Sequence, residues 1–331
     1  MNNNITALII SNGRLEYLRQ NINSLIKYNS NIFVIVNGNY EQTIKFLTAT
    51  EKNYSYLKFF VFNETVNKSN ARNKGLEAVT SDIIYFLDDD TFMDQDNIKI
   101  LQEKFEKYPT IGVVGGPNLT PPNSSRFQNI SGILLSSFCT SYKMSNRYLT
   151  KGNDRITNDE ELILCNLAIK KDLFIKYNLR FNEMLHYNEE NLLLEQLGKH
   201  NIKMMFSPQL KVYHHRRENL KSFLLQIYNS GKGRGIMSVI MPSSIKIFFL
   251  LPSLFIIYLL FLLSSKVSFT LLNIYILITL YNVITNYVCH KLKLLDIVTM
   301  FIISICSHVY YGIGFIVGLI EGLIWKIQKK Y

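Results

Sequence analysis

Three long apolar segments dominate the C-terminal part of the chain, at residues 245–263, 267–288 and 297–320. Each is close to the length of about 20 residues that a helix needs to cross the hydrocarbon core of a bilayer. A core helix of a soluble protein seldom stays apolar over such a length. The sequence therefore predicts an α-helical membrane region over residues 245–331, with two to three transmembrane helices.

The excess of basic residues lies in the same part of the chain. Lys and Arg number 36 and Asp and Glu 25, which gives a formal net charge of +11. Residues 1–202 are neutral, so the whole excess falls beside and between the apolar segments. This distribution favours anionic lipid headgroups, and not nucleic acid, as the basic partner. Residues 219–244 are predicted to form a basic amphipathic helix at the membrane interface.

The lysines also constrain the orientation in the membrane. Residues 1–218 lack the pattern of a signal peptide, so this part is expected to stay cytoplasmic, with the protein integral to the cell membrane. Two crossings would place Lys291 and Lys293 inside, as the positive-inside rule favours. A third crossing would place Lys326 outside, against that rule. Either the rule is violated, or one segment is re-entrant or lies in the interface.

Three glycines in the last apolar segment recur every four residues. Gly314, Gly318 and Gly322 would share one face of a helix. Small residues at this spacing let another helix approach closely. The spacing therefore predicts close packing against another span, and a second copy of the chain would make the protein a homo-oligomer.

The first 218 residues alternate between short apolar runs and segments of helical periodicity. This alternation predicts an α/β fold with a parallel sheet and helices on both faces. Ligands of such sheets bind outside the carboxyl ends of the strands. The predicted strands are 5–10, 32–36, 57–62, 83–87 and 162–169, whereas residues 111–140 are predicted to be rich in loops.

Asp88, Asp89 and Asp90 follow the apolar run 83–87 directly. Three carboxylates at the end of a buried strand repel one another, and a hard divalent cation is the simplest compensation. In an extended segment Asp88 and Asp90 point the same way. Asp89 then points away, as a surface or supporting carboxylate. A solvated acidic turn is the alternative interpretation of the triplet.

Several motifs in order resemble those of the family 2 glycosyltransferases. The resemblance covers about residues 5–240, and any one motif alone would be weak. The family's A-R-N-x-G-L, D-x-D, F-D-E, E-D-x-x-L and V-Y-H elements correspond to residues 71–76 (ARNKGL), 88–90 (DDD), 181–183 (FNE), 189–193 (EENLL) and 212–214 (VYH), and the opening T-Y-N-R corresponds to 11–14 (SNGR).

The resemblance implies a GT-A fold, with a mixed sheet flanked by helices, and sugar transfer from a nucleotide donor with inversion. Mg²⁺ or Mn²⁺ would stabilise the charge that develops on the leaving diphosphate. Asp90 is expected to bind the metal and Asp88 to bind the metal or the ribose. His214 or His215 could reach the metal or the pyrophosphate.

The resemblance assigns further residues to the donor and to the acceptor. On the donor side it places Ser11 and Arg14, with Arg72 near the diphosphate or in an ion pair with the aspartates. Glu190 stands where the family has its catalytic Asp, so it is the expected base. The fallback base is Glu189, and Asn166 is expected on the acceptor side.

The chain departs from the family pattern in two places. The second strand ends in Val36 and Asn37 instead of an acidic pair, so only Asn37 could contact a nucleobase, and UDP is the donor nucleotide by default. The Q-x-x-R-W element of polysaccharide synthases is absent near Gln226. We therefore expect transfer of a single sugar to a lipid-linked or surface-glycan acceptor at the cytoplasmic face.

Two other interpretations differ in function class. A catalytically silent membrane subunit would keep the fold and bind a partner in a glycan-assembly complex. An aspartyl phosphatase also carries D-x-D at a strand end, but it needs Thr or Val where this chain has Phe92. This second alternative is disfavoured.

Overall fold

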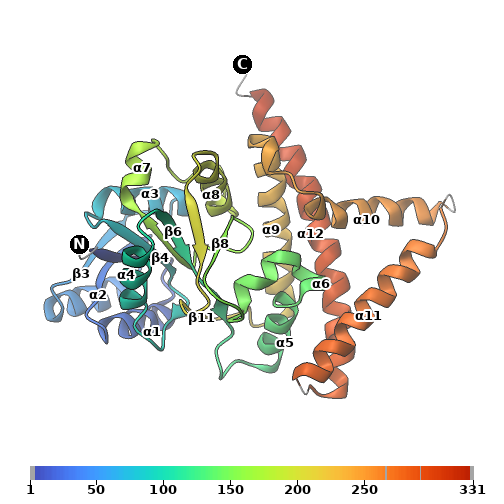
Figure 1. Ribbon diagram of the computed structural model, residues 1–331, viewed down its shortest axis with the longest axis horizontal. Helices are drawn as coiled ribbons and strands as arrows, with labels where there is room; N and C mark the ends of the chain where they lie inside the picture. The colour runs from blue at the N-terminus through green and yellow to red at the C-terminus, as the bar shows by residue number, and fades with distance from the viewer. Residues whose placement is uncertain (1–3, 265–266, 291, 329–331) are drawn as a thin grey trace. The chain divides into compact units, whose positions relative to one another are not determined.

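The computed structural model describes residues 4–264, 267–290 and 292–328 (Figure 1). Lys291, used above for the orientation, lies outside the described residues. Contacts divide the chain into two compact units. The first, which we call the α/β unit, holds residues 1–121 and 146–215. The second, the helical unit, holds residues 122–145 and 216–331. Residues 122–145 thus group with the C-terminal helices, whereas the predicted division kept them in the segment 1–218.

An eight-stranded mixed sheet forms the centre of the α/β unit, in the order β3-β2-β1-β4-β9-β6-β10-β8. The alternation of strands and helices predicted a parallel sheet, but the sheet is mixed. Strand β9 runs antiparallel to β4 and β6, and β8 runs antiparallel to β10. The strands are β1 (Ile5–Ser11), β2 (Asn31–Asn37), β3 (Leu57–Phe62), β4 (Ile83–Asp88), β6 (Ile111–Gly115), β8 (Arg155–Thr157), β9 (Asn166–Lys170) and β10 (Lys203–Phe206).

Helices cover both faces of this sheet. Successive strand residues point to opposite faces, so Ile9 joins a core with Leu18 and Leu101, while Leu8 joins a second core with Ala71 and Leu193. The helices are α1 (Leu15–Ile26), α2 (Glu41–Asn53), α3 (Lys68–Ala78), α4 (Asn97–Lys107), α7 (Lys171–Lys176) and α8 (Glu189–Lys199).

Helix α3 lies unusually close to the sheet at Gly75. A Cβ atom at Gly75 would lie 2.6 Å from a methyl carbon of Leu8, so only glycine fits without a shift. The same helix carries Arg72, and this close contact fixes the height of Arg72 above the strand ends.

A small second sheet joins three short strands, β5 (Thr91–Phe92), β7 (Asn118–Leu119) and β11 (Val212–His214), in the order β5-β11-β7. Strand β11 pairs antiparallel with β5, so that His214 stands opposite Thr91. This pairing brings a histidine from late in the chain to the acidic turn after β4.

The helical unit is built from α5 (Arg126–Leu135), α6 (Phe138–Ser141), α9 (Leu220–Ile240), α10 (Ile247–Leu263), α11 (Thr270–His290) and α12 (Leu294–Gln328). Among the described residues, α11 and α12 are long and apolar enough to cross a membrane, and α10 is a shorter apolar helix of 17 residues. The prediction of loops over residues 111–140 was wrong, because this stretch holds β6, β7, α5 and most of α6.

The glycine face of α12 packs against α9 of the same chain. Cβ atoms added at Gly314 and Gly318 would overlap the backbone carbonyl oxygens of Tyr228 and Lys232, and one at Gly322 would touch Val239. The predicted close packing through these glycines is therefore present, but the partner is a helix of the same chain. The face is already occupied, which removes the basis for a homo-oligomer through these three residues.

We expect Gly318→Ala to destabilise the helical unit by about 1–3 kcal/mol, because the added methyl group forces two backbones apart. Thermal unfolding of the detergent-solubilised protein would measure the loss. Gly198→Ala in α8 is the control, because a Cβ there meets only the end of Met204, at 3.9 Å. An unchanged melting temperature for Gly318→Ala would contradict the close packing.

Candidate active site

The acidic turn follows β4 directly, at the carboxyl edge of the sheet. The side chain of Asp88 is 36% exposed, whereas those of Asp89 and Asp90 are 1% and 4% exposed. Neighbouring aspartates therefore meet very different surroundings. Asp88 faces solvent, and the other two carboxylates need partners within the protein.

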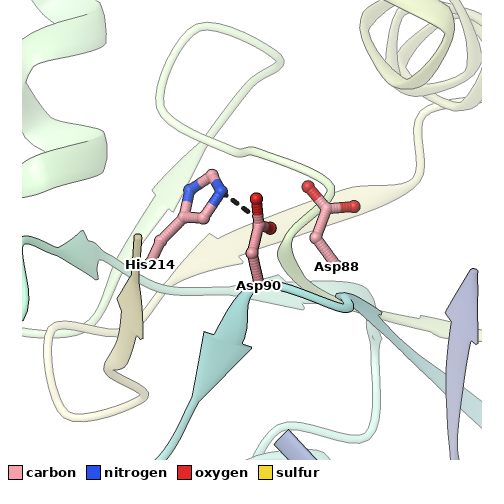
Figure 2. Close-up of side chains that lie close together, drawn as sticks. All are labelled: Asp88, Asp90 and His214. Atoms are coloured by element: carbon pink, nitrogen blue, oxygen red, sulfur yellow. Dashed lines mark ion pairs between the residues drawn. The ribbon is translucent and has the colours of Figure 1, made fainter. Parts of the chain in front are cut away.

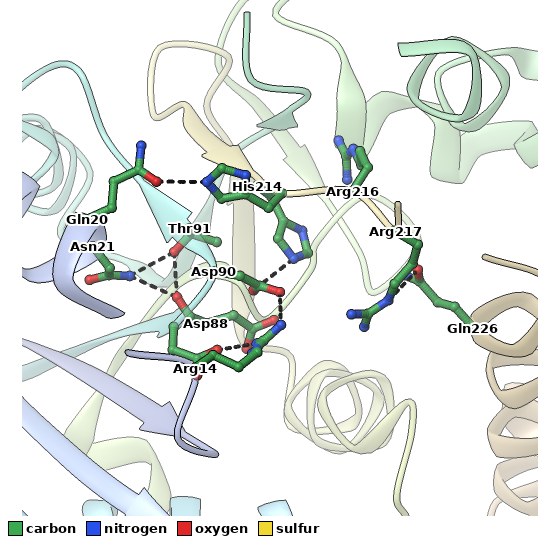
Figure 3. A network of polar contacts seen from close by, with 12 residues as sticks. Arg14, Gln20, Asn21, Asp88, Asp90, Thr91, His214, Arg216, Arg217 and Gln226 are labelled. Carbon is green, nitrogen blue, oxygen red and sulfur yellow. Dashed lines mark hydrogen bonds and ion pairs between the residues drawn. The ribbon is translucent and has the colours of Figure 1, made fainter. Parts of the chain in front are cut away.

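Helix α1 holds this turn in place through Asn21. The Asn21 side chain donates to the Asp88 carbonyl oxygen at 2.8 Å and to the Thr91 hydroxyl at 3.1 Å (Figure 3). The Thr91 hydroxyl donates to the same carbonyl at 2.7 Å. Sequence reasoning missed this support, because no motif marks an asparagine on the buried side of a helix.

Asp88, Asp90 and His214 form a group whose ligand atoms all lie within 4.8 Å of one another (Figure 2). The His214 Nε2 atom lies 3.1 Å from a carboxylate oxygen of Asp90. Two carboxylates and an imidazole that converge in this way suit Mn²⁺ or Mg²⁺. His215 contacts α1 instead, since its ring nitrogen lies 2.8 Å from Gln20. Of the two histidines, His214 is therefore the one that can serve a metal.

Arg14 lies between the two buried carboxylates. Its guanidinium forms an ion pair with Asp89 and a second one with Asp90 at 2.5 Å (Figure 3). Asp89 was predicted to point away as a surface or supporting carboxylate. It is buried and paired, so the interpretation as a surface residue was wrong. Arg14 was predicted on the donor side, and the structure assigns it the role of counter-ion to the turn.

The two buried aspartates differ in the direction of their pKa shift. Burial raises the pKa of Asp89 to about 6, although the Arg14 charge opposes this shift. Burial by itself would also raise the pKa of Asp90, but His214 and Arg14 outweigh it and hold that pKa well below its usual range. Asp90 is therefore ionised at any physiological pH, as a metal ligand must be.

Arg72 connects the acidic turn to the start of α8. Its guanidinium forms an ion pair with Glu189, buried on both sides, and lies 3.8 Å from Asp88. Glu190 is the next residue, half-buried at the first turn of α8. Burial, followed by the Glu189 charge, raises the pKa of Glu190 to about 7. Such a carboxylate can accept a proton near neutral pH, while Glu189 is held by Arg72.

Two other residues predicted at the site, Ser11 and Asn37, are buried. Ser11 is the last residue of β1 and is not exposed to solvent. The Asn37 amide donates to Asn12 and to the Val66 carbonyl oxygen and accepts from the Val66 nitrogen, each at 2.9 Å. Both N–H groups of this amide are used within the protein and Asn37 is buried, so the prediction that Asn37 contacts the donor is not supported by its geometry.

Asn166 is fully buried in a network under the site. It accepts from the Tyr85 hydroxyl at 2.7 Å and donates to the carbonyl oxygens of Pro117 and Leu210. The predicted contact with the acceptor is corrected by this geometry, because both amide groups are used within the protein. Asn166 ties the sheet to the two loops that carry β7 and β11.

We expect Asn166→Ala to lower the free energy of unfolding by about 3 kcal/mol, because three buried polar groups each lose one hydrogen bond. Chemical denaturation would measure the loss, with Asn53→Ala at the exposed end of α2 as control. The folded fraction should keep the acceptor KM of the parent protein. A raised KM with unchanged stability would restore the predicted acceptor contact.

The sequence model of Glycosyl transferase family 2 matches residues 6–176, which is more than half of the chain. The chain belongs to this family. The match includes the acidic turn, Arg72 and Asn166 but ends before Glu189, Glu190 and His214. The resemblance to this family that was drawn from the motifs is thereby confirmed.

Curated relatives of this family member are polysaccharide synthases. A poly-β-1,6-N-acetyl-D-glucosamine synthase from Staphylococcus aureus (strain COL) is 28% identical over 133 residues, 39% of this chain and 30% of the relative. The enzyme of the same name from Staphylococcus epidermidis is 30% identical over 103 residues, 31% of this chain and 23% of the relative. The matches span less than a third of the length of these relatives.

Among solved structures, a mannosyltransferase from Pyrobaculum calidifontis, in complex with GDP-Man and Mn²⁺, resembles nearly the whole chain. The TM-score is 0.59 at 11% identity, and the alignment covers 98% of this chain and 88% of that one. At this identity the likeness shows the fold alone. It confirms the predicted GT-A fold, with its mixed sheet flanked by helices and the C-terminal helices that follow.

Proposed function

We propose that this chain is a membrane-anchored, metal-dependent, inverting glycosyltransferase. It transfers a single sugar from a nucleotide-sugar donor to a lipid-linked or surface-glycan acceptor at the cytoplasmic face. The observation that carries the proposal is the pair of sites joined by Arg72. Asp88, Asp90 and His214 converge at one end, and Glu189 and Glu190 lie at the other.

The donor end supplies electrostatic stabilisation. Asp88, Asp90 and His214 would hold Mg²⁺ or Mn²⁺, which neutralises the charge that builds on the diphosphate as the sugar leaves. Asn21 keeps the turn in position, and Arg14 balances the charge of Asp89 and part of that of Asp90. Arg72 brings a further cation to the same side.

The acceptor end supplies the base. An acceptor hydroxyl that attacks the anomeric carbon must lose its proton, and Glu190 can take it, with a pKa of about 7. Attack from the side opposite the leaving diphosphate gives inversion. Glu189 remains the fallback, but its buried ion pair with Arg72 favours a role in holding Arg72 and spacing the two sites.

The donor and acceptor are inferred from weaker support. The curated relatives are named as N-acetyl-glucosamine polymerising enzymes, which favours UDP-N-acetyl-glucosamine as a first donor to test. The structural neighbour holds GDP-Man, so a GDP donor belongs in the same panel. The internal use of Asn37 removes the residue that we expected to read the base.

The membrane anchoring is supported by α11 and α12, which have the length and composition of spans. Most of α11 is exposed and apolar, at Leu271, Leu277 and Val288 for example. The net charge of +11 is carried beside these helices, as anionic lipids favour. We place the α/β unit on the cytoplasmic side, because two crossings then leave Lys293 inside, as the positive-inside rule favours.

A donor panel with membranes or purified protein tests the proposal. We expect one nucleotide sugar to be consumed with Mn²⁺ and not with EDTA, and the product to carry the inverted anomeric configuration. Retention of configuration would exclude the mechanism. If no donor is consumed, the silent membrane subunit gains, and the occupied Asn37 amide is the observation in its favour.

A further inference from the structure

Residues 122–145 lie between the two sequence segments of the α/β unit, but they pack with the apolar helices of the helical unit. Helix α5 begins with a capping box formed by Ser125 and Gln128. At its start, the Arg126 Nε atom donates to Asp296 at 2.7 Å, beside the first turn of α12. This ion pair holds the beginning of α5 at the level of the α11–α12 connection.

One face of α5 is buried among the candidate spans. Ile130 and Leu134 share a core with Val283 of α11 and with Met300 and Ile303 of α12. These contacts follow α5 along its length. The helix has 10 residues and is therefore about 15 Å long, about half of the hydrocarbon thickness of a bilayer.

The far end of this segment reaches the interior of α11. The Ser137 hydroxyl donates to the Asn282 side-chain oxygen, and the Asn282 amide donates to the Thr140 hydroxyl at 3.4 Å. Asn282 stands eight residues before His290, or about 12 Å along the helix from that end. It is farther still from the opposite end, at Thr270. Ser137 thus lies beside the middle of a candidate span.

The polar residues of this contact explain each other. An asparagine in the middle of an apolar span is costly unless it finds a polar partner. A short helix such as α6 at membrane depth needs protein around its backbone. Hydrogen bonds among the side chains of Asn282, Ser137 and Thr140 meet the first need, and the contact of Thr140 with Asn282 places α11 beside α6.

We propose that residues 126–142 form a re-entrant segment, inserted into the bilayer beside α11, whose tip contacts lipid acyl chains. Phe138, 61% exposed, and Cys139 form the tip. The ring of Tyr142 lies 4.6 Å from that of Phe248 in α10, a further apolar helix, and Lys143 follows as the chain returns. The apolar tip is thus continuous with the exposed apolar surface of the helices. The inference rests on the proposed membrane anchoring.

A fluorescent probe at Cys139 tests the insertion. The full chain with Cys165→Ala, Cys289→Ser and Cys306→Ala keeps one thiol, to be labelled with an environment-sensitive dye. The protein is placed singly in lipid nanodiscs of phosphatidylcholine and phosphatidylglycerol. Lipid with a nitroxide on the acyl chain is then added as quencher. Two comparison variants also carry Cys139→Ser, with the label at Leu277→Cys on α11 or at Lys52→Cys on α2.

We expect loss of fluorescence at Cys139 close to that at Leu277, and little loss at Lys52. Quenching at Leu277 without quenching at Cys139 would overturn the insertion and leave the membrane anchoring intact. Absence of quenching at both would overturn the anchoring and the insertion together. Asn282→Leu should reduce quenching at Cys139 and leave Leu277 unchanged, and equal quenching at Cys139 in this variant would refute the polar anchor.

Discussion

Asp90→Asn is expected to reduce sugar transfer by roughly 10³-fold, the scale seen when a preorganised electrostatic contact to the transition state is lost. Asp90 is buried and ionised, and its carboxylate pairs with both His214 and Arg14. An amide at this position cannot balance Arg14 and is a poor ligand for a hard cation. Initial rates at saturating donor and Mn²⁺ measure the loss.

Metal binding gives this prediction a second readout. Titration of Mn²⁺, followed by the electron paramagnetic resonance of the free ion, should show much weaker binding to Asp90→Asn than to the parent protein. Asp94→Asn is the matched control, because Asp94 follows β5 closely and pairs at the surface with Lys211. If Asp90→Asn binds Mn²⁺ and transfers sugar as the parent does, the metal is held elsewhere.

Glu190→Gln is expected to slow transfer by about 10²–10⁴-fold, the contribution of a positioned general base. The amide keeps the size of the side chain but cannot accept the proton of the attacking hydroxyl. The donor KM should change little, because Glu190 lies at the start of α8 and not among the metal ligands. Single-turnover rates with saturating acceptor separate the chemical step from binding.

The pH profile identifies the base. A carboxyl group with a pKa of about 7 loses its proton as the pH rises, so the transfer rate should increase through about pH 7 and then level off. Glu190→Gln should lose this rise, and Glu195→Gln on the same helix should keep it. If Glu189→Gln removes the rise and Glu190→Gln does not, the two glutamates exchange roles.

Most strands at the centre of the α/β unit can be predicted from local sequence. The runs 5–10, 32–36, 57–62 and 83–87 are short and apolar, with β-branched or aromatic residues, and each forms a strand at nearly the predicted bounds. Asp88 and Asp90 do lie in one group with His214, but residues 89–90 form a turn, so the alternation of an extended chain does not explain their approach. The order of the motifs along the sequence was sufficient to predict the GT-A fold.

The errors concern residues whose roles depend on distant partners. Asn37 and Asn166 were assigned to ligands because they correspond to positions of the family pattern that face donor and acceptor. Their amides are instead satisfied by the carbonyl groups of Val66, Pro117 and Leu210, which no local pattern indicates. Residues 111–140 were predicted as loops because their glycines and prolines hid a capped helix that packs against α11 and α12.

The ion pairs of Arg14 have a consequence for the assembly of the protein. In many small metalloproteins the ion is the only charge that balances its ligands, so folding waits for the metal. Here a covalently attached cation already neutralises Asp89 and contacts Asp90. We infer that the α/β unit can complete its folding before a metal ion binds, because Arg14 already compensates the buried carboxylates of the turn.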